Sequence, residues 1–201
     1  QLASSTRGRL QGDAQVSCSG ASIDSRQCKA GNVFFALQGE HTDGHQFIDG
    51  AVDAGCVALV VEREIETTVP YVIVQDARKA LYDLAMQQRM ELPALHVIAV
   101  TGSVGKTTTK DLIACMLGDR AVASEKSFNN DLGVPLTILA GDSAKFLIAE
   151  IGANDVGEIQ PLAELIQPDI ALLTSIDKAH LQGFGSEATV LSEKIKLIEA
   201  L

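Results

Sequence analysis

Residues 95–110 read LHVIAVTGSVGKTTTK, and this stretch decides the fold. The apolar run from Leu95 to Val100 predicts a strand, and a helical pattern over 107–117 begins directly after a glycine-containing turn. This order of strand, glycine turn and helix is typical of a phosphate-binding loop, because backbone N–H groups and the helix N-terminus face the anion. We expect Lys106 to supply a charge for the terminal phosphates and Thr107 a hydroxyl for Mg²⁺.

The match to the usual phosphate-loop motif is incomplete, because Val100 stands where the pattern begins with a glycine. The remaining pattern, G-x-x-G-K-T-T, is shorter and arises more often by chance. A plain glycine turn with an exposed Lys106 is therefore the alternative. The residues expected to contact a nucleotide are Thr101, Gly102, Ser103, Val104, Gly105, Lys106, Thr107 and Thr108.

Composition limits the classes of partner. The 201-residue chain has 16 basic and 26 acidic residues, a net charge of −10, so it lacks a general polyanion-binding surface and nucleic acid is not an expected partner. Its four cysteines form no C-x-x-C pair, which favours free thiols in a reducing cytosol over disulfides or a zinc site. The sequence has no secretory signal and no apolar run near the roughly 18 residues of a membrane span. We therefore expect a soluble, cytoplasmic protein.

The first part of the chain predicts a small α/β domain. The expected strands are 33–37, 56–61 and 71–74, and the expected helices are 47–54 and 77–90. Pro93 ends the last of these helices. We place the domain boundary there, between an N-terminal domain, 1–92, and a second domain, 93–201.

In the second domain, predicted strands alternate with predicted helices. The strands are 95–100, 120–123, 146–151 and 169–174, and the helices are 107–117, 133–140, 158–166 and 187–201. This alternation predicts a doubly wound, mostly parallel α/β sheet that binds ligands at the carboxyl ends of its strands. The last helix has no C-terminal cap and the chain starts without methionine, so we expect a fragment whose second domain is truncated.

Polar residues follow several of these strands. Glu150 lies at the end of the predicted strand 146–151, which neighbours the phosphate loop, and could bind Mg²⁺ directly or through water, with a surface charge as the alternative. His180 lies in a loop at the same sheet edge and could ligate a metal, although a lone loop histidine is ordinarily a surface residue. Asn129 and Asn130 precede a helix and by default cap it, which is compatible with a position facing the phosphates.

Four motifs together resemble the Mur ligase family. They are TGSVGKTTTK at 101–110, NNDLGVP at 129–135, EIGAN with GEI at 150–159, and AHL with GFGS at 179–186. The N-terminal part is similar to the UDP-binding domain of this family in DSR at 24–26, GNVFFAL at 31–37 and DGH at 43–45. The resemblance covers nearly the whole chain. It implies a UDP-binding α/β domain followed by an ATP-binding P-loop domain.

The resemblance also implies roles for individual residues. The catalytic residues would be Lys106, His180 and Lys194, and the metal ligands Thr107, Glu150, His180 and Lys194. The γ-phosphate would be oriented by Asn129 or Asn130. The UDP group would be bound by Asp24, Ser25, Arg26, Gly44 and His45, unless the turn at 24–26 is purely structural, since Asp and Ser are common turn formers.

Lys194 aligns with a lysine that in this family reacts with CO₂ to form a carbamate, an anion able to hold a second Mg²⁺. A solvated helix lysine is the alternative, and the alignment could shift to Lys196. Two departures from the family pattern are visible. Val104 stands where asparagine or serine is frequent, and the family's enzymes continue well past residue 201.

The implied activity is ATP-dependent amide formation in peptidoglycan precursor synthesis, with ATP and Mg²⁺ as cofactors. The segments 129–135 and 152–159 favour addition of D-alanyl-D-alanine to a UDP-N-acetylmuramoyl tripeptide over addition of a diaminoacid or glutamate. A P-loop kinase or nucleotide switch is a further alternative, as is a module that binds UDP-sugar or ATP without turnover. A monomer is expected.

Overall fold

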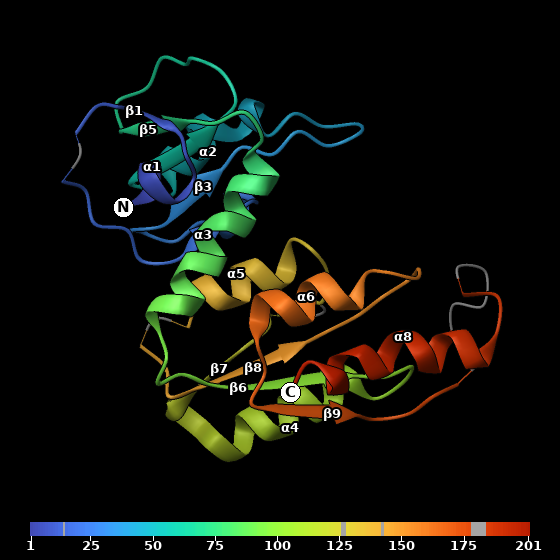
Figure 1. Ribbon diagram of the computed structural model, residues 1–201. Coiled ribbons are helices and arrows are strands. Elements are labelled where there is room, and N and C mark those ends of the chain that lie inside the picture. Colours follow the sequence, from blue (N-terminus) through green and yellow to red (C-terminus); the bar gives the residue numbers. More distant parts are fainter. Residues whose placement is uncertain (14, 126–127, 142, 178–183) are drawn as a thin grey trace. The chain divides into compact units, whose positions relative to one another are not determined.

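The computed structural model describes residues 1–201 except 14, 126–127, 142 and 178–183. The chain divides into two compact units, Gln1–Gln87 and Gln88–Leu201 (Figure 1). The division lies within helix α3 (Ala77–Glu91), a few residues before Pro93. No helix in the described part of the chain has the length and apolar character that a membrane crossing needs.

Unit 1 is built on a five-stranded sheet with the order β1-β5-β4-β3-β2. Its strands are β1 (Arg9–Gln11), β2 (Ala21–Ser22), β3 (Val33–Phe35), β4 (Ala58–Val61) and β5 (Tyr71–Ile73). Its helical segments besides α3 are α1 (Leu2–Ser5), η1 (Ser25–Gln27), η2 (Gly44–Phe47) and α2 (Ile48–Asp53). β1 is antiparallel to β5, and the other pairs are parallel.

The strands predicted at 33–37, 56–61 and 71–74 are present but shorter. β4 begins two residues later than expected, because the N–H of Cys56 bonds to Ala51 O at the end of α2. Strands β1 and β2 were not predicted. With three and two residues, they are too short to show an alternating pattern.

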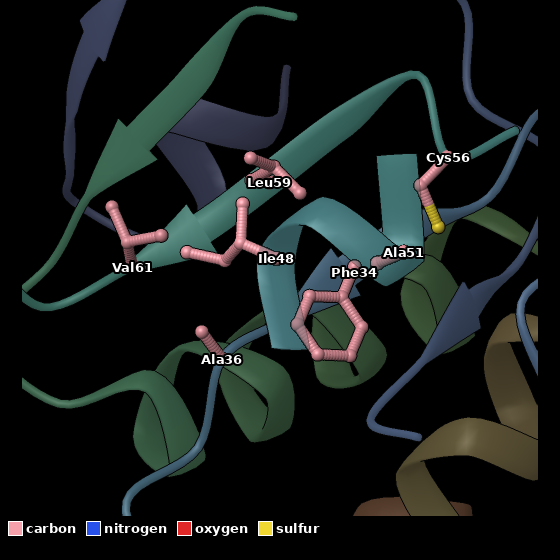
Figure 2. Close-up of a cluster of buried hydrophobic side chains, with 7 residues drawn as sticks. All are labelled: Phe34, Ala36, Ile48, Ala51, Cys56, Leu59 and Val61. Atoms are coloured by element: carbon pink, nitrogen blue, oxygen red, sulfur yellow. The ribbon is translucent and has the colours of Figure 1, made fainter. Parts of the chain in front are cut away.

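One face of this sheet packs on α2, as Figure 2 shows. Phe34 and Leu59 point to this face from adjacent strands, and Ile48 and Ala51 approach from α2. The same packing brings the loop before α2 to the carboxyl end of β3, where the N–H of Gly44 bonds to Leu37 O. A side chain at residue 44 would meet the backbone of Ala36 and Leu37 at under 3.0 Å, so only glycine fits there.

Unit 2 contains a fully parallel sheet with the order β7-β8-β6-β9. Its strands are β6 (His96–Thr101), β7 (Ala121–Ala123), β8 (Phe146–Glu150) and β9 (Ile170–Leu173). Its helices include α4 (Lys106–Leu117), η3 (Gly118–Arg120), α5 (Gly133–Leu139), α6 (Ile159–Ile166) and α8 (Glu187–Glu199). The predicted alternation of strands and helices is confirmed.

Helices cover both faces of this sheet. Ile98, Val100 and Ile148 form a cluster against α4, which contributes Ile113 and Leu117. Helices α5, α6 and α8 lie on the opposite face (Figure 1). The α/β class and the double winding are therefore as predicted, and the carboxyl ends of β6, β7, β8 and β9 lie at one edge of the sheet.

Candidate functional site

The phosphate loop, residues 102–105, joins β6 to α4 and is held by the loop after β9. The N–H of Ser103 donates to Ser175 O at 2.9 Å, and the N–H of Val104 donates to Ser175 Oγ at 3.0 Å. Thr174 Oγ1 donates to Val104 O at 2.7 Å. The amides of Ser103 and Val104, which we expected to face a phosphate, are therefore used within the protein.

The anion-binding groups that remain are at the start of α4. Gly105, with φ of 88°, turns the chain into this helix, and the first intrahelical bond runs from Thr109 N–H to Gly105 O. The N–H groups of Lys106, Thr107 and Thr108 consequently have no acceptor within the helix, which is the arrangement that binds phosphates. Lys106 Nζ donates to Gly102 O at 2.8 Å, so the lysine lies over the loop.

Two of the expected nucleotide-contacting residues have side chains directed away from the loop's inner side. Thr101 is the last residue of β6, and it is fully buried beneath the loop. Val104 is 62% exposed on the outer side of the loop, where a side chain changes the backbone cradle little. Gly102, with φ of 146°, passes so close to Thr174 that a side chain would clash.

Glu150 lies directly beside the phosphate loop. It ends β8 and pairs in register with Val100 of β6, and its side chain is 1% exposed. Thr107 Oγ1 donates to Glu150 Oε2 at 2.7 Å, and Asn129 Nδ2 donates to Oε1 at 2.8 Å. A hydroxyl, a carboxylate and an amide from three segments thus meet at the carboxyl edge of the sheet. The surface-charge alternative for Glu150 does not fit this burial.

The structure separates the two asparagines. Asn129 contacts Glu150, whereas Asn130 Oδ1 accepts the N–H of Gly133, the first residue of α5, at 2.9 Å. Asn130 therefore caps the helix, as the default interpretation has it. Gly152 is required next to Asn129, because a Cβ there would lie 2.8 Å from Asn129 Cγ.

Sequence reasoning missed two buried polar residues behind this site. Ser124 Oγ accepts the N–H of Glu150 at 3.1 Å, and Ser124 O accepts Lys110 Nζ at 2.7 Å. Both side chains are buried, so they fix the backbone from which Glu150 projects. The available signal was Lys110 itself, one helical turn after Lys106 and hence on the sheet-facing side of α4.

Lys194 and Lys196 have different environments on α8. Lys194 is 2% exposed, and its pKa is lowered by burial and by the charge of Lys106, against a smaller opposing effect of Glu193. Lys196 instead donates to Glu193 Oε2 at 2.6 Å and is partly exposed. The charge of Lys106 in the phosphate-binding segment thus acts on Lys194. His180, the remaining expected metal ligand, lies outside the described residues.

The candidate UDP-binding residues lie in unit 1. Asp24 accepts the N–H of Arg26 and pairs with its guanidinium at 2.7 Å, and the rest of the Arg26 side chain is exposed. Ser25 begins the short helix η1 that Asp24 caps. The turn at 24–26 is therefore stabilised by a hydrogen bond and an ion pair between its own residues.

His45 is buried with both ring nitrogens engaged. Nδ1 contacts Asp43 Oδ1 at 2.7 Å, and Nε2 accepts the N–H of Glu62 at 3.1 Å. Its ring thus ties the loop containing Gly44 to the end of β4. In this arrangement neither ring nitrogen of His45 is free to form a hydrogen bond with a substrate.

The donor atoms around Glu150 are those that Mg²⁺ prefers. A carboxylate and a hydroxyl are hard oxygen ligands, and Mg²⁺ is usually held by one or two carboxylates together with substrate phosphates. Among the residues that the structure describes, no group of three or more His, Cys, Asp or Glu is placed to hold a metal ion. In ligand chemistry alone, the carboxylate of Glu150 and the hydroxyl of Thr107 are suited to a magnesium ion.

A parallel α/β sheet with a phosphate loop, an adjacent buried acid and a buried lysine places the chain in the P-loop class of α/β folds. The chain belongs to the Mur ligase family. The Mur ligase middle domain matches residues 100–201, and the domain described as the Mur ligase family catalytic domain matches residues 17–102.

Several relatives carry the same name. The UDP-N-acetylmuramoyl-tripeptide–D-alanyl-D-alanine ligases of Haemophilus influenzae and Escherichia coli are 41% and 38% identical over 100% of this chain, which covers 46% and 45% of their lengths. The crystal structure of MurF from Acinetobacter baumannii has a TM-score of 0.85 and 34% identity, with 100% of this chain and 45% of that chain covered. MurF from Thermotoga maritima in complex with ADP has a TM-score of 0.74 and 30% identity, with 94% and 44% covered. The chain thus spans slightly under half the length of these relatives.

Proposed function

We propose that the intact protein joins D-alanyl-D-alanine to a UDP-N-acetylmuramoyl tripeptide in an ATP-dependent ligation of peptidoglycan precursor synthesis. The names of the relatives support the substrates, and the ADP complex of MurF from Thermotoga maritima supports the nucleotide. The observation that carries the proposal is the buried Glu150 carboxylate, bonded at 2.7 Å to Thr107 of the phosphate loop.

The chemistry requires activation of a poor acylating agent. The terminal carboxylate of the tripeptide attacks the γ-phosphorus of ATP, which gives an acyl phosphate and ADP. The amine of the dipeptide then attacks the acyl carbon, and phosphate leaves from the tetrahedral intermediate as the amide forms. Lys106 and the N–H groups at the start of α4 would neutralise charge on the transferred phosphoryl oxygens.

We propose that Thr107 and Glu150 hold Mg²⁺. The hydrogen bond from Asn129 Nδ2 would fix the orientation of the Glu150 carboxylate. When bound, the metal offsets the repulsion between the two anions that must approach each other. The part of the protein is to orient the ligands, which it does through the two hydrogen bonds to Glu150.

We also propose Lys194, not Lys196, as the site of a carbamate. An amine must be neutral to add to CO₂, and burial beside Lys106 lowers the pKa of Lys194. Lys196 is held in an ion pair with Glu193. His180 is proposed as a further metal ligand on the family resemblance alone.

Unit 1 would anchor the UDP group, remote from the reacting carboxylate, so that its binding energy orients the substrate. The exposed part of Arg26 is suited to a diphosphate, and Ser25 can donate a hydrogen bond. Asp24, Gly44 and His45 would shape the two loops. We propose that the protein works in the cytoplasm as a monomer.

The test is ATP consumption by the intact protein with a panel of UDP-N-acetylmuramoyl peptides and amino acceptors. We expect ADP release only with the tripeptide and D-alanyl-D-alanine together, and none from Lys106→Ala, which should still bind the UDP substrate. Turnover with a diaminoacid would assign another ligase of the family. ATP hydrolysis independent of both substrates would indicate a nucleotide switch, and binding without turnover a non-catalytic module.

A further inference from the structure

Glu193 is a buried acid on α8, immediately before Lys194. Its side chain is 1% exposed, although it stands in the polar run SEK at 192–194. Oε1 accepts the N–H of Ile159, the first residue of α6, at 2.9 Å. Oε2 accepts Lys196 Nζ at 2.6 Å. A buried carboxylate of one helix thus caps the start of another.

Helix α6 has no side-chain cap from its own N-terminal residues, and Glu193 of α8 supplies one. Its N-cap residue, Glu158, makes no side-chain capping bond. The N–H group of Ile159 bonds to Glu193 instead. Burial raises the pKa of Glu193, but the hydrogen bonds from Lys196 and from the N–H of Ile159 outweigh this effect and lower the pKa. An anion at a helix N-terminus is also favoured by the helix dipole.

The position of this cap connects two parts of the site. The segment 151–158 runs from Glu150 to the start of α6, so the bond to Ile159 fixes the far end of the segment that follows Glu150. On α8, Glu193 and Lys194 are successive residues about 100° apart around the helix axis. Glu193 meets α6, whereas Lys194 is buried on another side of the helix, with Nζ over the Phe184 ring at 6.0 Å and within reach of the charge of Lys106. The rotation of α8 about its axis is therefore determined on two sides.

We propose that Glu193 is a positioning residue that holds Lys194 in its buried place beside the phosphate loop. The carboxylate fixes α8 against the N-terminus of α6, and this contact sets the rotation that buries Lys194. Glu193 acts through Lys194 and touches neither nucleotide nor substrate. The consequence for catalysis rests on the proposed function, whereas the positioning itself does not.

The experiment measures the reactivity of individual lysines in the protein without substrates. Wild type, Glu193→Ala and the matched control Glu199→Ala, which removes an exposed acid from the same helix, are labelled with limiting acetic anhydride in CO₂-depleted buffer and analysed by mass spectrometry. In Glu193→Ala we expect labelling of Lys194 to rise several-fold. Labelling of Lys110, an equally buried lysine on α4, should stay unchanged, as should all lysines in the control.

Steady-state kinetics of the intact protein supply the second readout. Displacement of Lys194 should lower kcat by about ten- to a hundredfold, because a misplacement of about 1 Å has that effect. KM for ATP should be unaffected, since the phosphate loop is intact. Glu193→Gln, whose amide oxygen can still accept the N–H of Ile159, should restore much of the rate.

Unchanged labelling of Lys194 in Glu193→Ala would overturn the proposal, as would an equal rise at Lys110, which would show general loosening. If Glu193→Ala does not fold, Glu193→Asp is used for the same measurements. This variant keeps the charge, but its shorter side chain moves the carboxylate away from the N–H of Ile159. A variant that matches wild type in labelling and kcat would then overturn the positioning role. If the wild-type protein has no ligase turnover, the proposed function fails, and the labelling still decides the role of Glu193.

Discussion

Glu150→Gln separates metal binding from folding at the candidate site. The substitution removes the charge of a side chain that is 1% exposed and keeps its size. The amide oxygen can still accept Asn129 Nδ2, and the hydroxyl of Thr107 can rotate to accept from the new N–H. Two charge-assisted bonds become neutral ones, which lowers the free energy of unfolding by about 2 kcal/mol or less.

The effect on nucleotide binding should depend on Mg²⁺. A unit charge attracts another at 4 Å by about 1 kcal/mol in water and by about 4 kcal/mol at the effective dielectric near a protein surface. Neutralisation of Glu150 should therefore weaken Mg²⁺–ATP binding by at least about fivefold and by up to about a thousandfold. Binding of metal-free ATP should stay the same or strengthen, because an anion next to the triphosphate has been removed.

Isothermal titration with ATP, in excess Mg²⁺ and in EDTA, measures both affinities. Glu199→Gln, an exposed change on α8, is the matched control and should behave as wild type. Thermal melting establishes that the variant is folded at the assay temperature. Equal weakening with and without Mg²⁺, or unchanged Mg²⁺–ATP affinity in Glu150→Gln, would refute the assignment of this carboxylate to the metal.

Three further predictions concern other parts of the chain. Lys194→Ala should lose ligase turnover in the intact protein, and added short carboxylic acids should restore part of it by replacing the carbamate; no rescue would contradict that role. Bonds from Arg63 and from the N–H of His45 hold the pKa of Asp43 well below its usual range, so the stability advantage of wild type over Asp43→Asn should be full above about pH 4 and decline below it, as urea titrations at several pH values would show. Phe34→Ala should destabilise unit 1 by about 3–5 kcal/mol, because it opens a cavity beside α2, and a urea midpoint equal to that of wild type would contradict the packing in Figure 2.

The sequence was sufficient for features that depend on local order along the chain. The strand, glycine turn and helix at 95–117 follow from their own residues, and Glu150 was found because an apolar strand ends in an acid. The capture of the Ser103 amide by Ser175 could not be found this way. It requires β9 to lie next to β6, a neighbour relation that the pattern of strands and helices leaves open.

Burial of charged side chains was the second feature beyond sequence reasoning. An acid and a lysine three residues apart on a helix are ordinarily a solvated pair, and sequence reasoning did not single out Glu193. The approach of α6 makes Glu193 a buried cap. The roles of Asn129 and Asn130 differ because the turn before α5 aims one side chain at Glu150 and the other at Gly133. Tertiary packing decides which of the two adjacent asparagines takes which role. Because the two residues are identical, the sequence does not show this difference.

The placement of Lys194 is unfavourable for an ordinary lysine. The chain has a net charge of −10, yet this cation is buried within the electrostatic reach of another cation, Lys106. An ammonium at such a place loses hydration and is repelled, so it would favour a rotation of α8 toward solvent. The buried Val190 and Leu197 and the cap made by Glu193 oppose that rotation. A carbamate on the same nitrogen would reverse the sign of the interaction with Lys106, so a position that is costly for the amine becomes favourable for the anion.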